Sequence, residues 1–146
     1  MRNAICCFVF LFGSWSSIFG QNAPKLTTPR IVATFERLGL TTELPPTKIY
    51  TPKTWGTFRV SIVMVGTLAN GMSGSWNGAI RFTDGSGQNG PAGFGAGLYT
   101  VSRQTAVSAF PIRAKAGVPI KFFVRDGGGD KQGSKYNVWV VVEQLM

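Results

Sequence analysis

The sequence contains no histidine and only two cysteines, and these absences narrow the chemistry open to its 146 residues. Histidine is the commonest general base and the commonest metal ligand in proteins. Cys6 and Cys7 are adjacent and lie in the first ten residues. The composition therefore excludes zinc enzymes, serine or cysteine triads and histidine-dependent nucleases. No cofactor is expected, and the rest of the chain must fold by packing without disulfides.

Acidic residues are also scarce, with 6 Asp and Glu against 15 Lys and Arg, which gives a net charge of +9. Such a balance favours association with anionic partners, including acidic polysaccharides and other polyanions. The basic residues never form a run of three, and no nucleic-acid-binding module or basic helix accompanies them. We therefore expect no specific nucleic-acid binding, and a solvated basic surface is the alternative interpretation.

One long apolar run is present, over residues 4–12, and it follows the positive charge of Arg2. A spanning helix needs about 20 predominantly apolar residues, whereas serines and a glycine interrupt this run early. Ile18 and Gly20 occupy the minus-three and minus-one positions of a possible cleavage before Gln21. This anatomy predicts a signal peptide over residues 1–20 and a secreted, periplasmic or cell-surface protein without a stable transmembrane anchor.

The segment from 21 to 46 is rich in proline and threonine and predicts an extended lead-in with a possible first strand at 31–35. One helical turn is also compatible with residues 34–40, closed by Gly39. The remaining residues, 47–146, are expected to form a single domain.

Apolar residues recur at every second position in this domain, which is the signature of strands. Phe58, Val60 and Ile62 share one face of such a stretch, and Trp76 and Ile80 share one face of another. Segments with glycine, asparagine or aspartate separate the stretches and predict turns. The sequence therefore predicts an all-β, two-sheet sandwich, a jelly roll of about eight strands, with no amphipathic helix. The expected strands are 31–35, 48–51, 57–67, 75–83, 98–102, 106–114, 118–125 and 136–145.

The final stretch, 136–145, carries β-branched or aromatic residues on both sides and is expected to be buried on both faces for much of its length. Trp76 and Trp139 are accordingly expected in the core.

Residues 52–67 resemble the strand that follows a proline and glycine turn in C1q and tumour-necrosis-factor-like jelly rolls, with Gly56, Phe58 and Val60 in the matching positions. The ending, 136–145, resembles the central C-terminal strand of those domains. The resemblance implies a compact trimer with the terminal strands near the threefold axis, a role in binding or display, and no catalytic site. A long glycine-rich segment between Trp76 and Leu98 departs from the family pattern and puts the topology in doubt.

Candidate ligand contacts are Trp55 and Phe94, which lie in turn or loop contexts, together with Tyr99, Arg59 and Arg81. Exposed aromatic rings can stack on a ligand. The glycine-rich segment 85–97 lacks the spacing and the following helix of a phosphate-binding loop, so it predicts a loop that carries Phe94.

Asp126 and Asp130 flank three glycines and are weak candidates for calcium binding, because Ca²⁺ needs more oxygen ligands than two carboxylates supply. A hairpin connection is the favoured interpretation of this segment. The six acidic residues could also support a small carboxylate-dependent hydrolase, but the sequence places no two of them together.

These observations predict an exported, non-enzymatic β-sandwich module with a structural or binding role, which self-associates as a homo-oligomer. The alternative is a glycan- or polyanion-binding module that uses loop aromatics and basic residues, and the second alternative is the small hydrolase.

Overall fold

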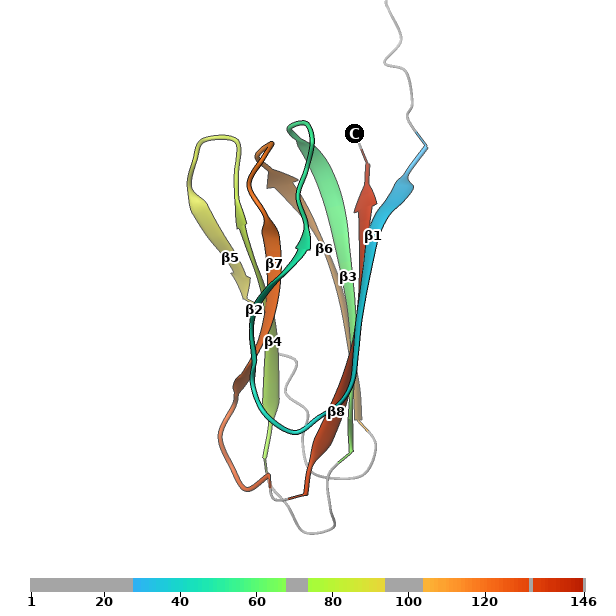
Figure 1. Cartoon of the computed structure of the whole chain (residues 1–146), viewed down its shortest axis with the longest axis vertical. Helices are drawn as coiled ribbons and strands as arrows, with labels where there is room; N and C mark the ends of the chain where they lie inside the picture. Colours follow the sequence, from blue (N-terminus) through green and yellow to red (C-terminus); the bar gives the residue numbers. More distant parts are fainter. Residues whose placement is uncertain (1–27, 68–73, 94–103, 132, 146) are drawn as a thin grey trace, which may run out of the picture.

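The computed structural model describes residues 28–67, 74–93, 104–131 and 133–145, and these form two four-stranded antiparallel sheets packed face to face (Figure 1). The first sheet has the strand order β1-β8-β3-β6, and the second has the order β2-β7-β4-β5. The strands are β1 (Arg30–Leu40), β2 (Leu44–Tyr50), β3 (Gly56–Thr67), β4 (Trp76–Thr83), β5 (Asn89–Gly93), β6 (Gln104–Ala114), β7 (Ile120–Asp126) and β8 (Lys135–Gln144).

This strand order is that of a jelly roll, in which consecutive strands alternate between the two sheets. The exception is the β4–β5 hairpin, whose two strands pair within the second sheet. β3 and β8 are both inner strands of the first sheet, as expected for the two stretches with the longest apolar pattern. The prediction of an all-β, two-sheet jelly roll with about eight strands is confirmed. No helix among the described residues is long and apolar enough to cross a membrane.

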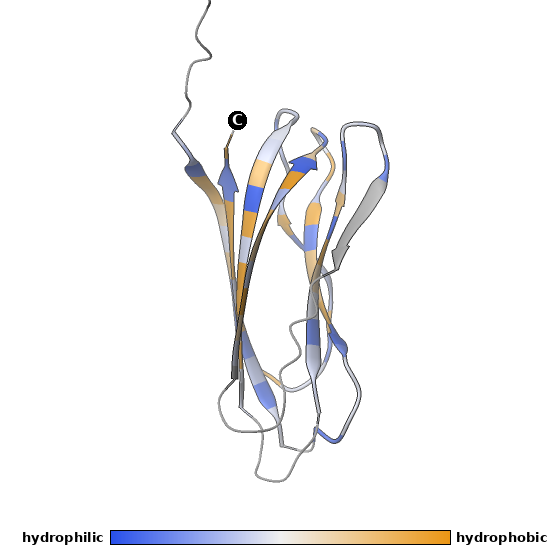
Figure 2. Ribbon diagram, turned by 180° about the vertical axis from the view of Figure 1, so that it is seen from behind, coloured by the Kyte–Doolittle hydropathy of each residue, from blue (hydrophilic) through white to orange (hydrophobic). Residues whose placement is uncertain are grey.

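The core fills the space between the sheets with the inward residues of each strand. Figure 2 shows orange bands alternating with pale or blue bands along the strands. The predicted inner face of β3 is confirmed, because Phe58, Val60 and Ile62 are almost completely buried. From the second sheet Ile80 and Phe122 meet them, with no exposed surface of their own. Burial of each such side chain contributes about 1.5–3 kcal/mol, which lets the domain fold without disulfides.

Two local predictions near the glycines were wrong. Residues 34–40 continue β1 and form no helical turn, because their backbone pairs with β8. Gly39, with φ of 65°, lies at the irregular end of that pairing. β5 lies inside the segment 85–97 that the sequence predicted to be a loop. The strand predicted at 98–102 lies outside the described residues, as do residues 1–20, which the sequence predicts to be a signal peptide.

The segment that contains Asp126 and Asp130 is not a hairpin, which corrects a third expectation. β7 belongs to the second sheet and β8 to the first, so this segment crosses from one sheet to the other.

Trp139 was expected in the core but lies on the outer face of the first sheet, where its indole Nε1 donates a hydrogen bond to Glu36 Oε1 at 2.8 Å. Alternate residues of β8, including Tyr136 and Val138, point inward and leave Trp139 no place between the sheets. Trp76 is buried, as predicted.

Three connections meet at one end of the sandwich, at the top of Figure 1: those between β2 and β3, β4 and β5, and β6 and β7. Backbone hydrogen bonds hold them together. Lys115 N donates to Thr83 O at 2.8 Å, and Gly117 N donates to Pro52 O at 2.9 Å. Residues distant in the sequence are therefore fixed beside one another at this end.

Candidate functional site

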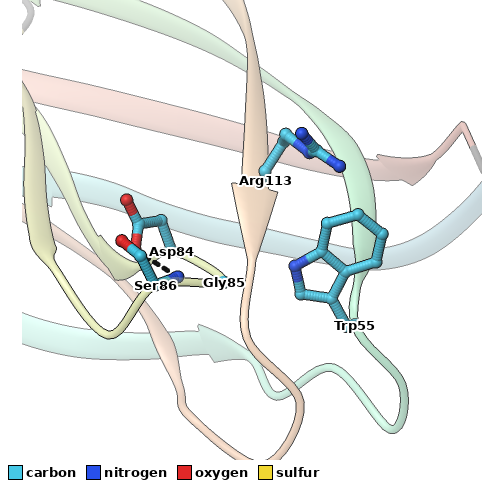
Figure 3. Close-up of a pocket in the computed structure, with 5 residues that line it drawn as sticks. All are labelled: Trp55, Asp84, Gly85, Ser86 and Arg113. Carbon is cyan, nitrogen blue, oxygen red and sulfur yellow. Dashed lines mark hydrogen bonds between the residues drawn. The ribbon is translucent and has the colours of Figure 1, made fainter.

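A hollow of about 410 Å³ lies where the three connections meet. It is lined by Trp55 from the β2–β3 connection, by Asp84, Gly85 and Ser86 from the β4–β5 turn, and by Arg113 from the end of β6 (Figure 3). The indole of Trp55 and the guanidinium of Arg113 thus lie beside the β4–β5 turn in one open site.

Trp55 is held in place although 49% of it is exposed. The guanidinium carbon of Arg113 lies 4.4 Å from the centre of the indole ring, which is a cation–π contact. The indole Nε1 is directed at Gly85, and a Cβ atom added there would collide with it. The close approach of the ring to the β4–β5 turn therefore depends on a glycine at position 85.

Asp84 is fixed by the turn that it begins. Its Oδ1 accepts hydrogen bonds from Ser86 N at 2.9 Å, Ser86 Oγ at 2.7 Å and Gln88 N at 2.9 Å. The Ser86 hydroxyl contributes most to lowering the pKa of Asp84 below its usual value, and backbone amides of the turn add to this effect against the opposing effect of burial. The carboxylate is therefore charged at neutral pH and lines the hollow in a fixed position.

A second hollow, of about 460 Å³, is lined by Thr57, Pro111, Ile112 and Arg113. It shares Arg113 with the first. Thr57 and Arg113 face each other across β3 and β6, so this hollow extends from the end of the sandwich onto the edge of the first sheet. A ligand longer than one ring could contact both hollows across Arg113.

The arrangement is suited to binding a polyhydroxylated ligand. An exposed indole offers an apolar surface with a negative face, a carboxylate accepts hydrogen bonds from hydroxyl groups, and a guanidinium donates them. Arg113 and Asp84 line the same hollow, yet among the described residues they form no ion pair with each other. The hollow therefore carries one acidic and one basic side chain, with the guanidinium held over the indole and the carboxylate held by the turn.

The predicted ligand contacts do not gather in one place. Trp55 lines the hollow, whereas Arg59 lies on the outer face of the first sheet, where its Nε donates to Glu143 Oε2 at 2.6 Å. The ion pair raises the pKa of Arg59 and lowers that of Glu143. Arg81 lies on the outer face of the second sheet, against the ring of Phe123. Phe94 and Tyr99 lie outside the described residues.

Among the described residues, the candidate metal ligands Asp126 and Asp130 belong to no cluster that could hold a metal ion. Within the described ranges no three Cys, Asp or Glu side chains gather. Asp126 forms an ion pair with Lys131 and accepts a hydrogen bond from Gly128 N at 2.6 Å. The contact with Lys131 is the main reason why the pKa of Asp126 is lowered.

The sequence analysis did not assign Asp84 or Arg113 to a ligand site. Asp84 belongs to the six acidic residues and Arg113 to the 15 basic residues, and nothing in the sequence singled out either of them. Only the strand topology could have indicated that these two residues lie together, because a jelly roll brings the β2–β3, β4–β5 and β6–β7 connections to one end.

Searches against protein-family models and against curated proteins found no match. Among solved structures, the chain is similar to the CBM22-1 xylan-binding domain from Paenibacillus barcinonensis Xyn10C. The similarity covers 80% of this chain and 86% of that one, with a TM-score of 0.41 and 8% sequence identity. Likeness at this level does not identify a shared family or ligand.

Proposed function

We propose that the protein is a carbohydrate-binding module that holds a neutral oligosaccharide at the Trp55 hollow. The observation that carries this proposal is the placement of a half-exposed indole beside a carboxylate and a guanidinium in one open site. One ring of the sugar would lie against the indole, and its hydroxyl groups would pair with Asp84 and Arg113.

Binding without chemistry is favoured over hydrolysis by the residues that line the hollows. Glycoside hydrolysis uses two carboxyl groups about 5–9.5 Å apart across the scissile bond. Asp84 is the one carboxylate among the described residues that line the two hollows. Glu143, on the outer face of the first sheet, is already paired with Arg59.

The test is a screen of neutral oligosaccharides of different linkage against the wild-type protein, followed by calorimetry on each ligand that binds. Trp55→Ala is expected to reduce affinity by tenfold or more. Trp139→Phe changes a tryptophan on the outer face of the first sheet and serves as the matched control with unchanged affinity. Failure of every neutral oligosaccharide to bind, or equal affinity in Trp55→Ala and wild type, contradicts the proposal.

A second candidate function, self-association, is favoured by the outer face of the first sheet. Val107, Val63 and Trp139 lie side by side across β6, β3 and β8, and Val107 is 67% exposed. Glu36, bonded to Trp139, borders this row, and the ion pair between Arg59 and Glu143 lies on the same face toward one end. An apolar centre with a polar rim is the usual anatomy of a protein interface. We propose that a second copy of the chain covers this face.

Light scattering across a range of concentrations tests this second candidate. The wild-type protein is expected to be oligomeric at micromolar concentration, and Val107→Lys is expected to shift it to the monomer. Thr41→Lys adds the same charge at an exposed position of the connection between β1 and β2 and is the control. A wild-type monomer at every concentration would rule the candidate out.

A further inference from the structure

The outer face of the second sheet carries a row of three cations on adjacent strands. Lys48 on β2 is paired in register with Lys121 on β7, and Lys121 is paired with Arg81 on β4. Paired residues in neighbouring strands point to the same side of a sheet, so the three side chains project together, away from Phe122 and the core.

A fourth cation extends this group along β7. Arg125 lies four residues beyond Lys121, on the same face. Phe123 lies between them, with the Arg81 guanidinium 5.6 Å and the Arg125 guanidinium 5.3 Å from its ring centre. Both guanidinium groups are therefore held by a ring that is itself only 9% exposed. We call Lys48, Arg81, Lys121 and Arg125 the cationic face.

Among the described residues no ion pair includes a residue of this face, although Glu43, whose Oε1 accepts a hydrogen bond from Asp126 N, lies next to Arg125 at one end of it. All six acidic residues lie in the described part of the chain, and the two ion pairs found there join Arg59 with Glu143 and Lys131 with Asp126. Glu36 is held by Trp139 on the opposite sheet. Since like charges placed opposite each other in a sheet oppose folding, the fold itself gives no reason for the row.

We propose that the cationic face is a second binding site, which takes an anionic polysaccharide bearing sulfate or carboxylate groups. The positive groups extend across three strands and along one of them, so they form a broad, flat surface. Such a surface suits a flexible anionic polysaccharide, which can contact several cations at once. Guanidinium groups donate paired hydrogen bonds to such anions, and the lysines add charge without fixed geometry. This site is separate from the Trp55 hollow and does not depend on the proposed function.

The same observations disfavour the other polyanions. Binding of single-stranded nucleic acid uses exposed aromatic rings on which bases stack, whereas Phe123 is buried under two guanidinium groups. Anchoring at a membrane surface uses exposed apolar side chains beside the charges. The large apolar residues that are exposed in the described part of the chain are Ile31, Leu38, Trp55 and Val107, and none belongs to a strand of the second sheet.

Binding to dextran sulfate and to polygalacturonate, with uncharged dextran as the blank, tests this proposal and separates sulfate from carboxylate recognition. The double variant Arg81→Gln/Lys121→Gln is expected to lose about fivefold in affinity for each cation removed. The slope of log affinity against log salt concentration is expected to fall by about one for each. Retention of neutral oligosaccharide binding in this variant would show that the Trp55 hollow is intact.

The matched control is Arg30→Gln/Lys135→Gln, which removes one arginine and one lysine from exposed positions of the first sheet. It is expected to bind both polyanions nearly as tightly as the wild type. Equal losses in the two double variants would show attraction by net charge alone and overturn the proposal. Tighter binding to single-stranded DNA or to anionic vesicles than to either polysaccharide would also overturn it. Circular dichroism and unfolding of both variants confirm that they are folded.

Discussion

Replacing Lys121 by glutamate should stabilise the protein, although it places an acid in a strand. Lys121 stands between Lys48 and Arg81 in adjacent strands, so wild-type Lys121 faces a like charge on each side. At a charge separation of about 6 Å, each pair costs about 0.7 kcal/mol in water. Screening at physiological salt, with a Debye length of about 8 Å, lowers this to about 0.3 kcal/mol.

The substitution removes two repulsive pairs and creates two attractive ones. The free energy of unfolding should therefore rise by about 1.3 kcal/mol at physiological salt and by about twice as much at low salt. Lys121→Gln removes the repulsion alone and should give about half of this gain. Urea unfolding at two salt concentrations measures these differences, and in 1 M salt the gain should nearly vanish.

Lys135→Glu is the control for the change in net charge, because Lys135 pairs with Thr67 and no charged residue is paired with it among the residues that the structure describes. It should stabilise the protein much less than Lys121→Glu. If the two variants gained equally, or if Lys121→Glu lowered stability, the argument that the three cations repel one another across the sheet would be refuted. The same Lys121→Glu variant should also lose binding to dextran sulfate.

Three further predictions concern the hollow and the titrating groups. Gly85→Ala should displace the Trp55 indole, because its Cβ would collide with Nε1, and calorimetry should show weaker oligosaccharide binding with little change in melting temperature. The pKa of Tyr136 is raised to about 12, first by burial and then by the charge of Glu43. Ionisation is thus favoured by unfolding, so stability should fall between pH 10 and about 12, and Tyr136→Phe should show a smaller fall in unfolding experiments. The pKa of Asp84 is lowered in the folded protein, so its ionised carboxylate stabilises the fold above the usual pKa. This stabilisation is lost as pH falls below about 4, so the loss of stability in acid should be less steep in Asp84→Asn than in the wild type.

The two-sheet fold was predictable because burial on one face forces apolar residues into alternate positions. Phe58, Val60 and Ile62 had to share a face whatever the topology, and a one-residue shift would have exposed all of them. β5 was not predictable in this way. Its sequence, Asn89–Gly93, has no alternation and no β-branched residue, and it is a strand because its backbone pairs with β4.

Trp139 shows a second limit of sequence reasoning. An aromatic residue in a β-branched stretch is compatible with burial on both faces, but β8 lies in a sheet with the core on only one side. The pattern could not show how many layers cover a strand. For the same reason the apolar row on the outer face of the first sheet was not predictable, because Val63 and Val107 are compatible with any strand position.

The candidate site was predictable only in part, for a related reason. Trp55 was recognisable as an aromatic residue in a turn, which is where ligand contacts concentrate. Its partners Asp84 and Arg113 come from other connections, and only the crossing pattern of the jelly roll brings them together. Arg59 and Arg81 were grouped with the loop aromatics by residue type alone. In the structure the two arginines project from the outer faces of opposite sheets.

The outward positions of the two sheets carry information that the inward positions do not. Inward residues are constrained by packing, so apolar side chains there report the fold alone. Outward residues are free of that constraint, and here one face carries Val63, Val107 and Trp139 whereas the other carries Lys48, Lys121 and Arg81. Composition showed an excess of positive charge, but only the register shows that three of those charges stand in one row, which no ion pair among the described residues includes. A row that opposes folding is best explained by what it binds, and for this reason stability and polyanion affinity should change in opposite directions when Lys121 is replaced.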